Sequence, residues 1–380
     1  MTTLTDQPSA SSEHLRRKLT KAIIAQGALL SPHWRDAFRT VSRHQFVDRF
    51  MVLSQDGEPE KHDLTDPAHQ DAAMDAVYRD APLVTQEDAH GTPTSSSSQP
   101  SMMARMLEAT DLRPGMSVLE IGTGTGYNAA LLSHALGSDA VTSVDIHPGL
   151  TKAASVALRR AGHEPTVVCG DGAQGHPDRA PYDRIIATCG VTRIPPAWLS
   201  QLKPGGIIVA NLGFGLTRLK LAADGSLTGP FLGYASFMSM RGDTRETATT
   251  ARDVLALTSA PGTRHDMPML PVEERIVTFL RSVMMPGITC ITEERIDGKD
   301  YILTDSESGS WARALDTGTG TAAVFEDGSR HLWAELTRVA DAWLSNECPE
   351  ISAYGLTVTG EGEHSLWLDS PERRRWLLSG

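Results

Sequence analysis

The sequence predicts an α/β protein with a doubly wound parallel sheet, followed by a smaller C-terminal α+β domain. Strands and helices alternate from residue 100 onward, a glycine-rich turn follows the first buried strand, and the pattern becomes mixed after residue 241. Such alternation is typical of a parallel sheet whose two faces are covered by helices. With 380 residues, the chain has room for two or three domains of about 150 residues each.

Composition predicts the domain boundaries. Residues 1–13 are polar and without helical period, so they are expected to form a flexible tail. The α/β domain is expected over residues 14–240, with a polar loop insertion near residues 51–77. Residues 241–380 are expected to form an accessory domain that recognises a peptide.

Apolar periodicity predicts the elements in chain order. Two helices come first, at residues 14–25 and after Pro32, and residues 91–99 are expected to be either a linker or a binding loop. Three further helices are expected, at 102–109, 126–135 and 150–161. Five strands alternate with them, at 117–121, 140–145, 165–169, 183–188 and 206–211. Beyond these, the pattern predicts antiparallel strands within 216–237 and helices at 273–283 and 332–344.

Charge argues against nucleic acid as a partner. The chain has 35 basic and 47 acidic residues and a formal net charge of -12, which repels a phosphate backbone, and no basic patch offsets it. An Asn-Pro-Pro-Tyr-like motif for a base amine is also missing, since Cys189-Gly190-Val191 follows the strand that ends at Thr188. A nucleic-acid enzyme is therefore the less favoured alternative. A binding module that has lost catalysis is a second alternative to an active enzyme.

The four cysteines and the absence of long apolar runs predict a soluble protein of the reducing cytoplasm. The cysteines form no CxxC pair and have no histidine at zinc-site spacing, so neither disulfides nor a metal site are expected. Basic residues 16–18 precede an apolar stretch, but Gln26 and Gly27 interrupt it, which favours a helix over a signal peptide. No run approaches the ~18 apolar residues of a membrane span.

The most informative motif is ExGxGxG at residues 120–126. Its glycines lie between a buried strand and a helix, where they let the backbone turn tightly and approach a ligand. A dinucleotide motif, G-x-G-x-x-G, would need a glycine where Tyr127 stands. The spacing instead resembles motif I of the class I S-adenosylmethionine-dependent methyltransferases.

This resemblance implies a Rossmann-like class I methyltransferase domain with S-adenosyl-L-methionine as cofactor and S-adenosyl-L-homocysteine as its product. The residues of the motif implied to bind the cofactor are Glu120, Gly122, Thr123, Gly124 and Gly126. Asp145 ends the next strand and suits the ribose hydroxyls, although a strand-terminal Asp is often only a cap. Asp171 and Gly172 follow the third strand, and the resemblance implies that the Asp171 carboxylate binds the exocyclic amine of adenine. The alternative is that these two residues only form an ordinary turn.

A serine-rich turn carries a second, more specific resemblance. Residues 94–108 read TSSSSQPSMMARMLE and residues 112–115 read LRPG. Four more motifs accompany them: VSRHQFV at 41–47, GDG at 170–172, APYD at 180–183 and QLKPGG at 201–206. Together they resemble the protein-L-isoaspartate O-methyltransferase family over about residues 30–215.

Two departures from that family change the expected substrate. The family's repair enzymes are shorter, and the Thr-Ile-Ser core of their turn is replaced here by serines. Motifs GTPT at 91–94, GLTV at 355–358 and LWLDSP at 366–371 resemble longer homologues associated with ATP-grasp (graspetide) or lanthipeptide maturation. This implies a cyclised precursor peptide whose esterified aspartate collapses to aspartimide, and a co-encoded ATP-grasp ligase as partner. The alternative is isoaspartyl repair, which the turn supports and the added length does not.

A carboxylate acceptor requires little catalytic chemistry from the protein. Its pKa near 4 leaves it ionised at neutral pH, so no general base is needed and catalysis consists of positioning. Ser98 is the first candidate to hold the acceptor, and its alternative role is to cap the helix that starts at Pro100. Gln99 and Thr188 are weaker candidates. Cys189 is expected to line the site rather than to act as a nucleophile.

Overall fold

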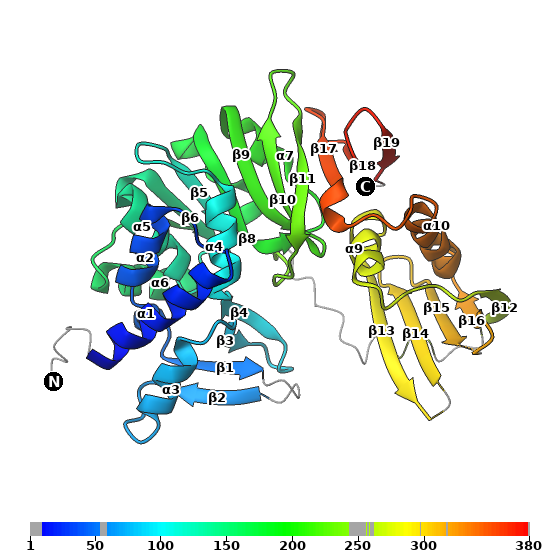
Figure 1. The fold of residues 1–380 in the computed structure, drawn as a ribbon, viewed down its shortest axis with the longest axis horizontal. Coiled ribbons are helices and arrows are strands. Elements are labelled where there is room, and N and C mark those ends of the chain that lie inside the picture. Colours follow the sequence, from blue (N-terminus) through cyan, green and yellow to red (C-terminus); the bar gives the residue numbers. More distant parts are fainter. Residues whose placement is uncertain are drawn as a thin grey trace.

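The computed structural model describes residues 10–53, 59–242, 256, 258, 262–296, 298–316 and 318–378. These residues form one large sheet, two smaller sheets and the helices that cover them (Figure 1). Helix α1 (Ala10–Ala25) begins four residues before the predicted start, and Ser12 is buried within it. The predicted tail is therefore wrong for residues 10–13, whereas residues 1–9 lie outside the described residues.

The central sheet has ten strands. Its parallel part consists of β5 (Val118–Ile121), β6 (Val141–Asp145), β7 (Thr166–Cys169), β8 (Tyr182–Val191) and β9 (Leu202–Leu212). Its antiparallel part consists of β10 (Gly215–Leu221), β11 (Leu227–Tyr234), β17 (Tyr354–Val358), β18 (His364–Leu368) and β19 (Arg374–Leu377). The spatial order is β19-β18-β17-β11-β10-β9-β8-β5-β6-β7. The predicted α/β class and its strands are confirmed.

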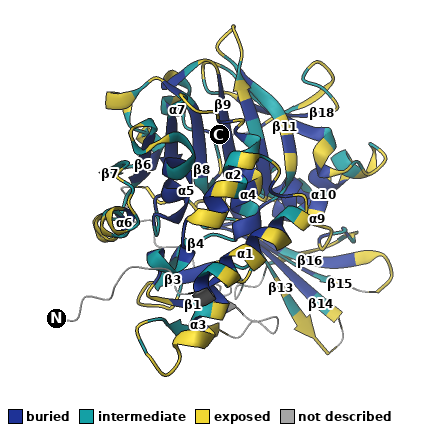
Figure 2. Ribbon diagram, turned by 60° about the vertical axis from the view of Figure 1, so that its left-hand side comes forward, coloured by how far each residue is buried: buried dark blue, intermediate teal, exposed yellow. Residues whose placement is uncertain are grey.

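Helices bury both faces of the parallel part, which explains the continuous apolar character of its strands. Leu119, Ile121, Ile185 and Ile186 are all at most 1% exposed, and Figure 2 shows β8 and β9 as largely buried. The predicted helices are confirmed as α2 (Pro32–Thr40), α4 (Pro100–Ala109), α5 (Tyr127–Leu136) and α6 (Pro148–Arg160). A short helix, α7 (Pro196–Ser200), connects β8 to β9.

The polar stretch near residues 51–77 is not a loop. It contributes β1 (Arg49–Leu53), β2 (Pro59–Asp63) and α3 (Gln70–Val77), and the two strands join β3 (Leu83–Glu87) and β4 (Pro93–Ser97) in a sheet of order β2-β1-β3-β4. Composition concealed β2 because it is an edge strand whose first three residues are exposed. The stretch predicted as a linker or binding loop, residues 91–99, likewise contains β4.

The C-terminal region divides differently from the prediction. A five-stranded antiparallel sheet is formed by β12 (Thr263–Pro268), β13 (Ile288–Arg295), β14 (Gly298–Asp305), β15 (Trp311–Asp316) and β16 (Thr321–Asp327). With the two predicted helices, α9 (Arg275–Met284) and α10 (Leu332–Leu344), it forms the smaller α+β unit. We call residues 263–344 the α+β unit.

Strands β17–β19 do not belong to the α+β unit, because they return to the central sheet through the pairing of β17 with β11. The prediction that 241–380 forms one domain is therefore wrong for residues 354–377. Apolar side chains of both parts share one hydrophobic core, in which Phe279 of α9 contacts Phe231 of β11 with ring centroids 4.7 Å apart. Within the described ranges, no helix combines the length and the apolar character that crossing a bilayer requires.

Candidate functional site

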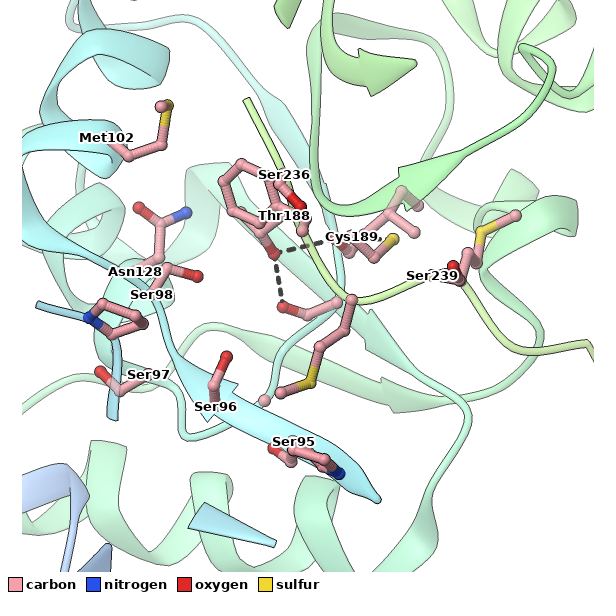
Figure 3. A pocket seen from close by; sticks show the side chains of 18 of the residues that line it. Ser95, Ser96, Ser97, Ser98, Met102, Asn128, Thr188, Cys189, Ser236 and Ser239 are labelled. Carbon is pink, nitrogen blue, oxygen red and sulfur yellow. Dashed lines mark hydrogen bonds between the residues drawn. The ribbon is translucent and has the colours of Figure 1, made fainter. Parts of the chain in front are cut away.

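A cavity of about 740 Å³ lies where the parallel strands of the central sheet end. The glycine motif, Asp145 and the end of β8 form its floor, and the serines of β4 form one wall. Figure 3 shows Ser95 to Ser98 on one side of the cavity and Thr188, Ser236 and Cys189 across from them. Ligands bind at this edge in open α/β sheets, so the cavity is the candidate active site.

The glycine motif forms a tight turn that brings backbone to the cavity surface. Gly122, Gly124 and Gly126 have φ values of +95°, +51° and +88°, which side chains other than glycine rarely adopt. A Cβ on Gly122 would lie 2.9 Å from the Thr188 hydroxyl, and one on Gly126 would lie 3.1 Å from the Ala154 side chain. Gly122, Thr123 and Gly124 line the cavity, whereas Gly126 lies behind them against α6.

Asp145 links the end of β6 to this turn. Its Oδ2 accepts a hydrogen bond of 2.9 Å from the Gly124 N–H, and its Oδ1 accepts one of 3.0 Å from the His147 N–H. The side chain is only half-buried and lines the cavity. Since each carboxylate oxygen can accept two hydrogen bonds, Asp145 keeps acceptor capacity for a hydroxyl-bearing ligand.

Glu120 lies beneath the turn, not in the cavity lining. It is fully buried and accepts hydrogen bonds from Asn128 Nδ2 at 2.7 Å and from Ser143 Oγ at 2.5 Å. Thr123 Oγ1 lies 2.7 Å from the same Ser143 hydroxyl. Burial raises the pKa of Glu120 to about 7. Glu120 therefore acts on the cavity through the residues it holds, and the predicted direct contact with a cofactor is not supported by its position.

Asp171 and Gly172 differ in their relation to the cavity. Asp171 accepts a hydrogen bond of 2.9 Å from the Ala173 N–H and so caps a single 3-10 turn, Gly172–Gln174. It is not among the lining residues, which fits the alternative of an ordinary turn. Gly172 does line the cavity, and a Cβ there would lie 2.6 Å from the Ile121 side chain.

Two of the residues that line the cavity each have a buried side-chain oxygen with no hydrogen-bond partner among the described residues. The two atoms are Ser95 Oγ and Asn128 Oδ1. A buried polar atom without a partner costs about 1–3 kcal/mol, so such atoms in a cavity indicate a polar ligand. Together with the half-buried backbone of the glycine turn and Asp145, they give this part of the cavity a polar lining.

Ser98 and Gln99 lie at the start of α4. Gln99 occupies the N-cap position of α4, but its side chain makes no capping hydrogen bond. Ser98 therefore does not cap α4, and among the described residues its hydroxyl has no hydrogen-bond partner although it lines the cavity. Gln99 Nε2 instead donates to Asp80 Oδ2 at 3.4 Å. Asp80 Oδ1 accepts from the Ser101 N–H at 2.8 Å and so takes the capping role.

Arg43, to which the sequence analysis gave no role, holds the serine wall in place. It is fully buried and remains cationic at neutral pH, because burial lowers its pKa only to about 10. Its guanidinium donates to the Ser97 hydroxyl and to five carbonyl oxygens, those of Val77, Arg79, Ala81, Ser97 and Ser98. The signal for this role in the sequence was the arginine within the VSRHQFV motif, between the buried residues Val41 and Phe46.

Thr188 and Cys189 lie in the second half of β8, where its pairing with β9 is irregular, across the cavity from the serine wall (Figure 3). The Thr188 hydroxyl lies 2.7 Å from the Gly122 carbonyl oxygen and 3.0 Å from that of Ile121, so its single proton is donated to the glycine turn. Burial raises the pKa of the Cys189 thiol to about 12, which leaves it protonated at neutral pH. Thr188 thus supports the turn, and Cys189 lines the cavity as a small apolar group.

The segment that follows β11 also lines the cavity, although the predicted antiparallel strands extended only to residue 237. We call residues 235–241 the strap. Its backbone is tied to β8, with Gly190 N–H donating to the Met238 carbonyl and Met240 N–H to the Gly190 carbonyl, both at 2.8 Å. At its end, Arg241 Nη2 donates to the Thr94 carbonyl at 3.0 Å, which joins the strap to β4.

The α+β unit also reaches the cavity, through Arg275 and Thr278 of α9. Sequence periodicity could not reveal this, because the contact depends on how α9 packs against β11. Among the residues that the structure describes, no three His, Cys, Asp or Glu side chains gather closely enough to hold a metal ion.

The chain is similar to known proteins of one family. Residues 67–228 match the family model "Protein-L-isoaspartate(D-aspartate) O-methyltransferase (PCMT)". The protein-L-isoaspartate O-methyltransferase of Pyrococcus horikoshii is 47% identical over 199 residues, 52% of this chain and 77% of the relative. That of Hyperthermus butylicus is 35% identical over 208 residues, 52% of this chain and 75% of the relative. That of Thermotoga maritima is 37% identical over 191 residues, but the match spans only 53% of its length.

A solved structure shares the fold over nearly the whole chain. It is a protein-L-isoaspartate O-methyltransferase with a TM-score of 0.55 and 24% sequence identity, and the alignment covers 93% of this chain and 100% of that chain. The α+β unit and the returning strands are therefore not peculiar to this chain.

Proposed function

Because the chain belongs to the protein-L-isoaspartate O-methyltransferase family, whose members are S-adenosylmethionine-dependent protein carboxyl O-methyltransferases, we propose that it methylates the free α-carboxylate of isoaspartyl residues. The observation that carries this proposal is one cavity in which the glycine turn and Asp145 face a wall of serine hydroxyls. The relatives named above are all called protein-L-isoaspartate O-methyltransferases.

The comparisons favour isoaspartyl peptides over a cyclised precursor as the substrate. Added length is one of the features from which the sequence predicts a peptide-maturation enzyme, beside the serine run and three short motifs. Added length no longer separates the two readings, because the alignment with a solved structure called a protein-L-isoaspartate O-methyltransferase covers 93% of this chain. The relatives named above do not bear on a co-encoded ATP-grasp ligase or an aspartimide product, and neither is part of the proposal.

In the proposed mechanism, the residues of the cavity position two ligands and remove water. The cofactor supplies an electrophilic methyl group. The backbone of Gly122 and Gly124 and the carboxylate of Asp145 would hold it at the floor. The acceptor carboxylate is already ionised at neutral pH, so the chain needs only to orient one oxygen toward the methyl group, at ~3–3.5 Å.

Ser98 is the proposed acceptor-holding residue. Its hydroxyl lines the cavity and can donate to a carboxylate oxygen, while Arg43 fixes its backbone through the Ser98 carbonyl at 3.0 Å. Met102, Phe237 and Met240 give the cavity apolar surface that would exclude water and strengthen this hydrogen bond. Gln99 and Thr188 have their side-chain donors engaged by Asp80 and Gly122, so they are proposed to position the walls.

Methyl transfer from labelled cofactor tests the proposal. Three peptides of one sequence would be compared, containing an isoaspartyl residue, a normal aspartyl residue, or a normal aspartyl residue within a side-chain-cyclised ring. We expect base-labile label in the isoaspartyl peptide only, and none with the Asp145→Ala variant. Labelling of the cyclised aspartyl peptide alone would overturn the proposal in favour of peptide maturation.

A further inference from the structure

The α+β unit places a guanidinium in the wall of the cavity. Arg275 lies in the first turn of α9 and lines the cavity together with Thr278, one turn further along. Its guanidinium carbon lies 4.3 Å from the centroid of the Tyr234 ring, a cation–π contact with the last residue of β11. Two further contacts fix α9 here: Phe279 packs on Phe231, and the Phe214 N–H donates to Ser282 Oγ at 2.9 Å.

The position of Tyr234 puts Arg275 on the side of the cavity away from the proposed cofactor site. Strand β11 pairs antiparallel with β10, which pairs antiparallel with β9, so β11 ends at the same edge of the sheet as the parallel strands. In the strand order, β11 is five steps from β6, the strand that ends at Asp145. At about 4.8 Å per step, the two strands are on the order of 20 Å apart.

Two of the three charged residues that line the cavity, among those described, are cationic. They are Arg241 and Arg275, and the third is Asp145. Arg241 is engaged by the Thr94 carbonyl, whereas Arg275 is exposed and makes no ion pair with a carboxylate of the described residues. Glu274 and Glu350 are the acidic groups whose charges act on Tyr234 beside Arg275, and both are exposed to solvent.

We infer that Arg275 is a specificity-determining residue, which favours acceptor peptides that carry a second carboxylate beside the isoaspartyl residue. The inference rests on the proposed function. A chain with a net charge of -12 repels acidic peptides at long range, and a cation at the acceptor side of the cavity offsets this locally. Its attachment to Tyr234 holds the guanidinium in one place, so that a peptide carboxylate can meet it without ordering a free side chain.

Isoaspartyl peptides that differ at one neighbouring position test the inference. The position next to the isoaspartyl residue would be Glu, Gln or Lys, and kcat and KM would be measured separately. For the wild-type protein we expect kcat/KM for the Glu peptide to exceed that for the Gln peptide by about 2–5-fold, mostly through KM, as one exposed ion pair allows. In 1 M salt, where the Debye length falls to about 3 Å, the preference should disappear.

Variants assign the preference to Arg275. Arg275→Gln should treat the three peptides nearly alike and retain the cofactor affinity of the wild-type protein, measured by calorimetry. Arg275→Lys should keep part of the preference for Glu. Arg338→Gln is the matched control, because Arg338 is an exposed arginine of α10 that does not line the cavity, and it should behave as the wild-type protein.

Two results would overturn the inference and leave the proposed function intact. One is an isoaspartyl activity without preference among the three peptides, and the other is a preference that survives in Arg275→Gln. If no isoaspartyl peptide is methylated while cofactor still binds, the proposed function itself fails, and the inference fails with it.

Discussion

At the scale of single residues, hydroxyl and carboxyl groups around the cavity divide into those that hold the protein and those that remain available to a ligand. Thr188 donates to the glycine turn and Glu120 accepts from Ser143 and Asn128, so both stabilise the site from behind. Ser98 and Asp145 line the cavity with hydrogen-bonding capacity left over. Two hydroxyl residues, or two carboxyl residues, can therefore have different roles here, depending on whether their hydrogen bonds are already made within the protein.

Ser98→Ala should impair the acceptor step and leave cofactor binding unchanged. Loss of one hydrogen bond to a charged group costs about 1.5–3 kcal/mol, so kcat/KM for an isoaspartyl peptide should fall by about 10–100-fold. Steady-state kinetics and calorimetry with the cofactor measure the two effects. Ser98→Thr, which keeps the hydroxyl, should recover much of the activity. An equal loss of cofactor affinity in the alanine variant would show that Ser98 serves the cofactor instead.

Glu120 should make stability fall as pH rises. Its folded-state pKa of about 7 lies above the ordinary value of 4.5, so the folded protein binds the proton more tightly than the unfolded chain. The stabilisation is complete below pH 4.5 and is lost as pH rises through 7, with a total effect of up to about 3 kcal/mol.

Urea unfolding at pH 5 and pH 8 measures this effect. Glu120→Gln removes the titrating group and should remove this part of the pH dependence, whatever its effect on absolute stability. Glu164→Gln, at an exposed glutamate, serves as control. An unchanged pH slope in Glu120→Gln would contradict the assignment.

At the scale of elements, β4 and the start of α4 owe their conformation to Arg43 more than to their own sequence. Residues 93–99 are Pro, Thr, Ser and Gln, which have little apolar surface to anchor a strand. The buried guanidinium binds the carbonyls of Ser97 and Ser98, and Asp80 caps α4. A side chain some fifty residues earlier in the chain thus shapes the acceptor wall.

Arg43→Gln should therefore loosen the serine wall. Several buried carbonyl oxygens would lose their donors, at about 1–3 kcal/mol for each one that stays unsatisfied. We expect a loss of at least about 3 kcal/mol of unfolding free energy and faster hydrogen exchange in residues 93–99, measured by mass spectrometry. Arg43→Lys should recover little of the lost stability, since an ammonium group cannot reproduce the several hydrogen bonds of the planar guanidinium. Arg49→Lys, at an exposed arginine, is the control, and equal exchange in both variants would refute the role of Arg43.

At the scale of the whole molecule, the chain leaves the central sheet after β11, builds the α+β unit and returns through β17. Leu356, Leu366, Phe279 and Phe231 share one hydrophobic core, so the returning strands bind both parts together. This arrangement explains how α9 reaches the cavity. It also argues against removal of residues 241–380 as a test of substrate selection, because three strands of the central sheet would be lost.

Calorimetry should reveal a single unfolding transition, since the core is shared. Leu366→Ala, in β18, removes a fully buried side chain and should lower stability by about 2–5 kcal/mol without splitting that transition. Leu377→Ala in β19 is the control, because Leu377 is 73% exposed. Two separate transitions, of which Leu366→Ala shifts only one, would show that the sheet and the α+β unit unfold independently.

The sequence by itself determined the α/β class, nearly every element from residue 100 to 237, and the place of the glycine turn. These features depend on local periodicity and on backbone conformations that only glycine adopts readily. The same local rules did not reveal β2, whose residues are polar because the strand lies at a sheet edge.

Tertiary structure alone decided which polar groups face the cavity. Glu120 and Asp145 both lie in or at the end of parallel strands, yet one is buried beneath the turn and the other lines the cavity. Arg43, the strap and Arg275 reach the site from segments far apart in the chain, and β17–β19 return to a sheet that the chain left more than a hundred residues earlier. Long-range packing sets these contacts, and sequence periodicity carries no information about which surfaces will meet.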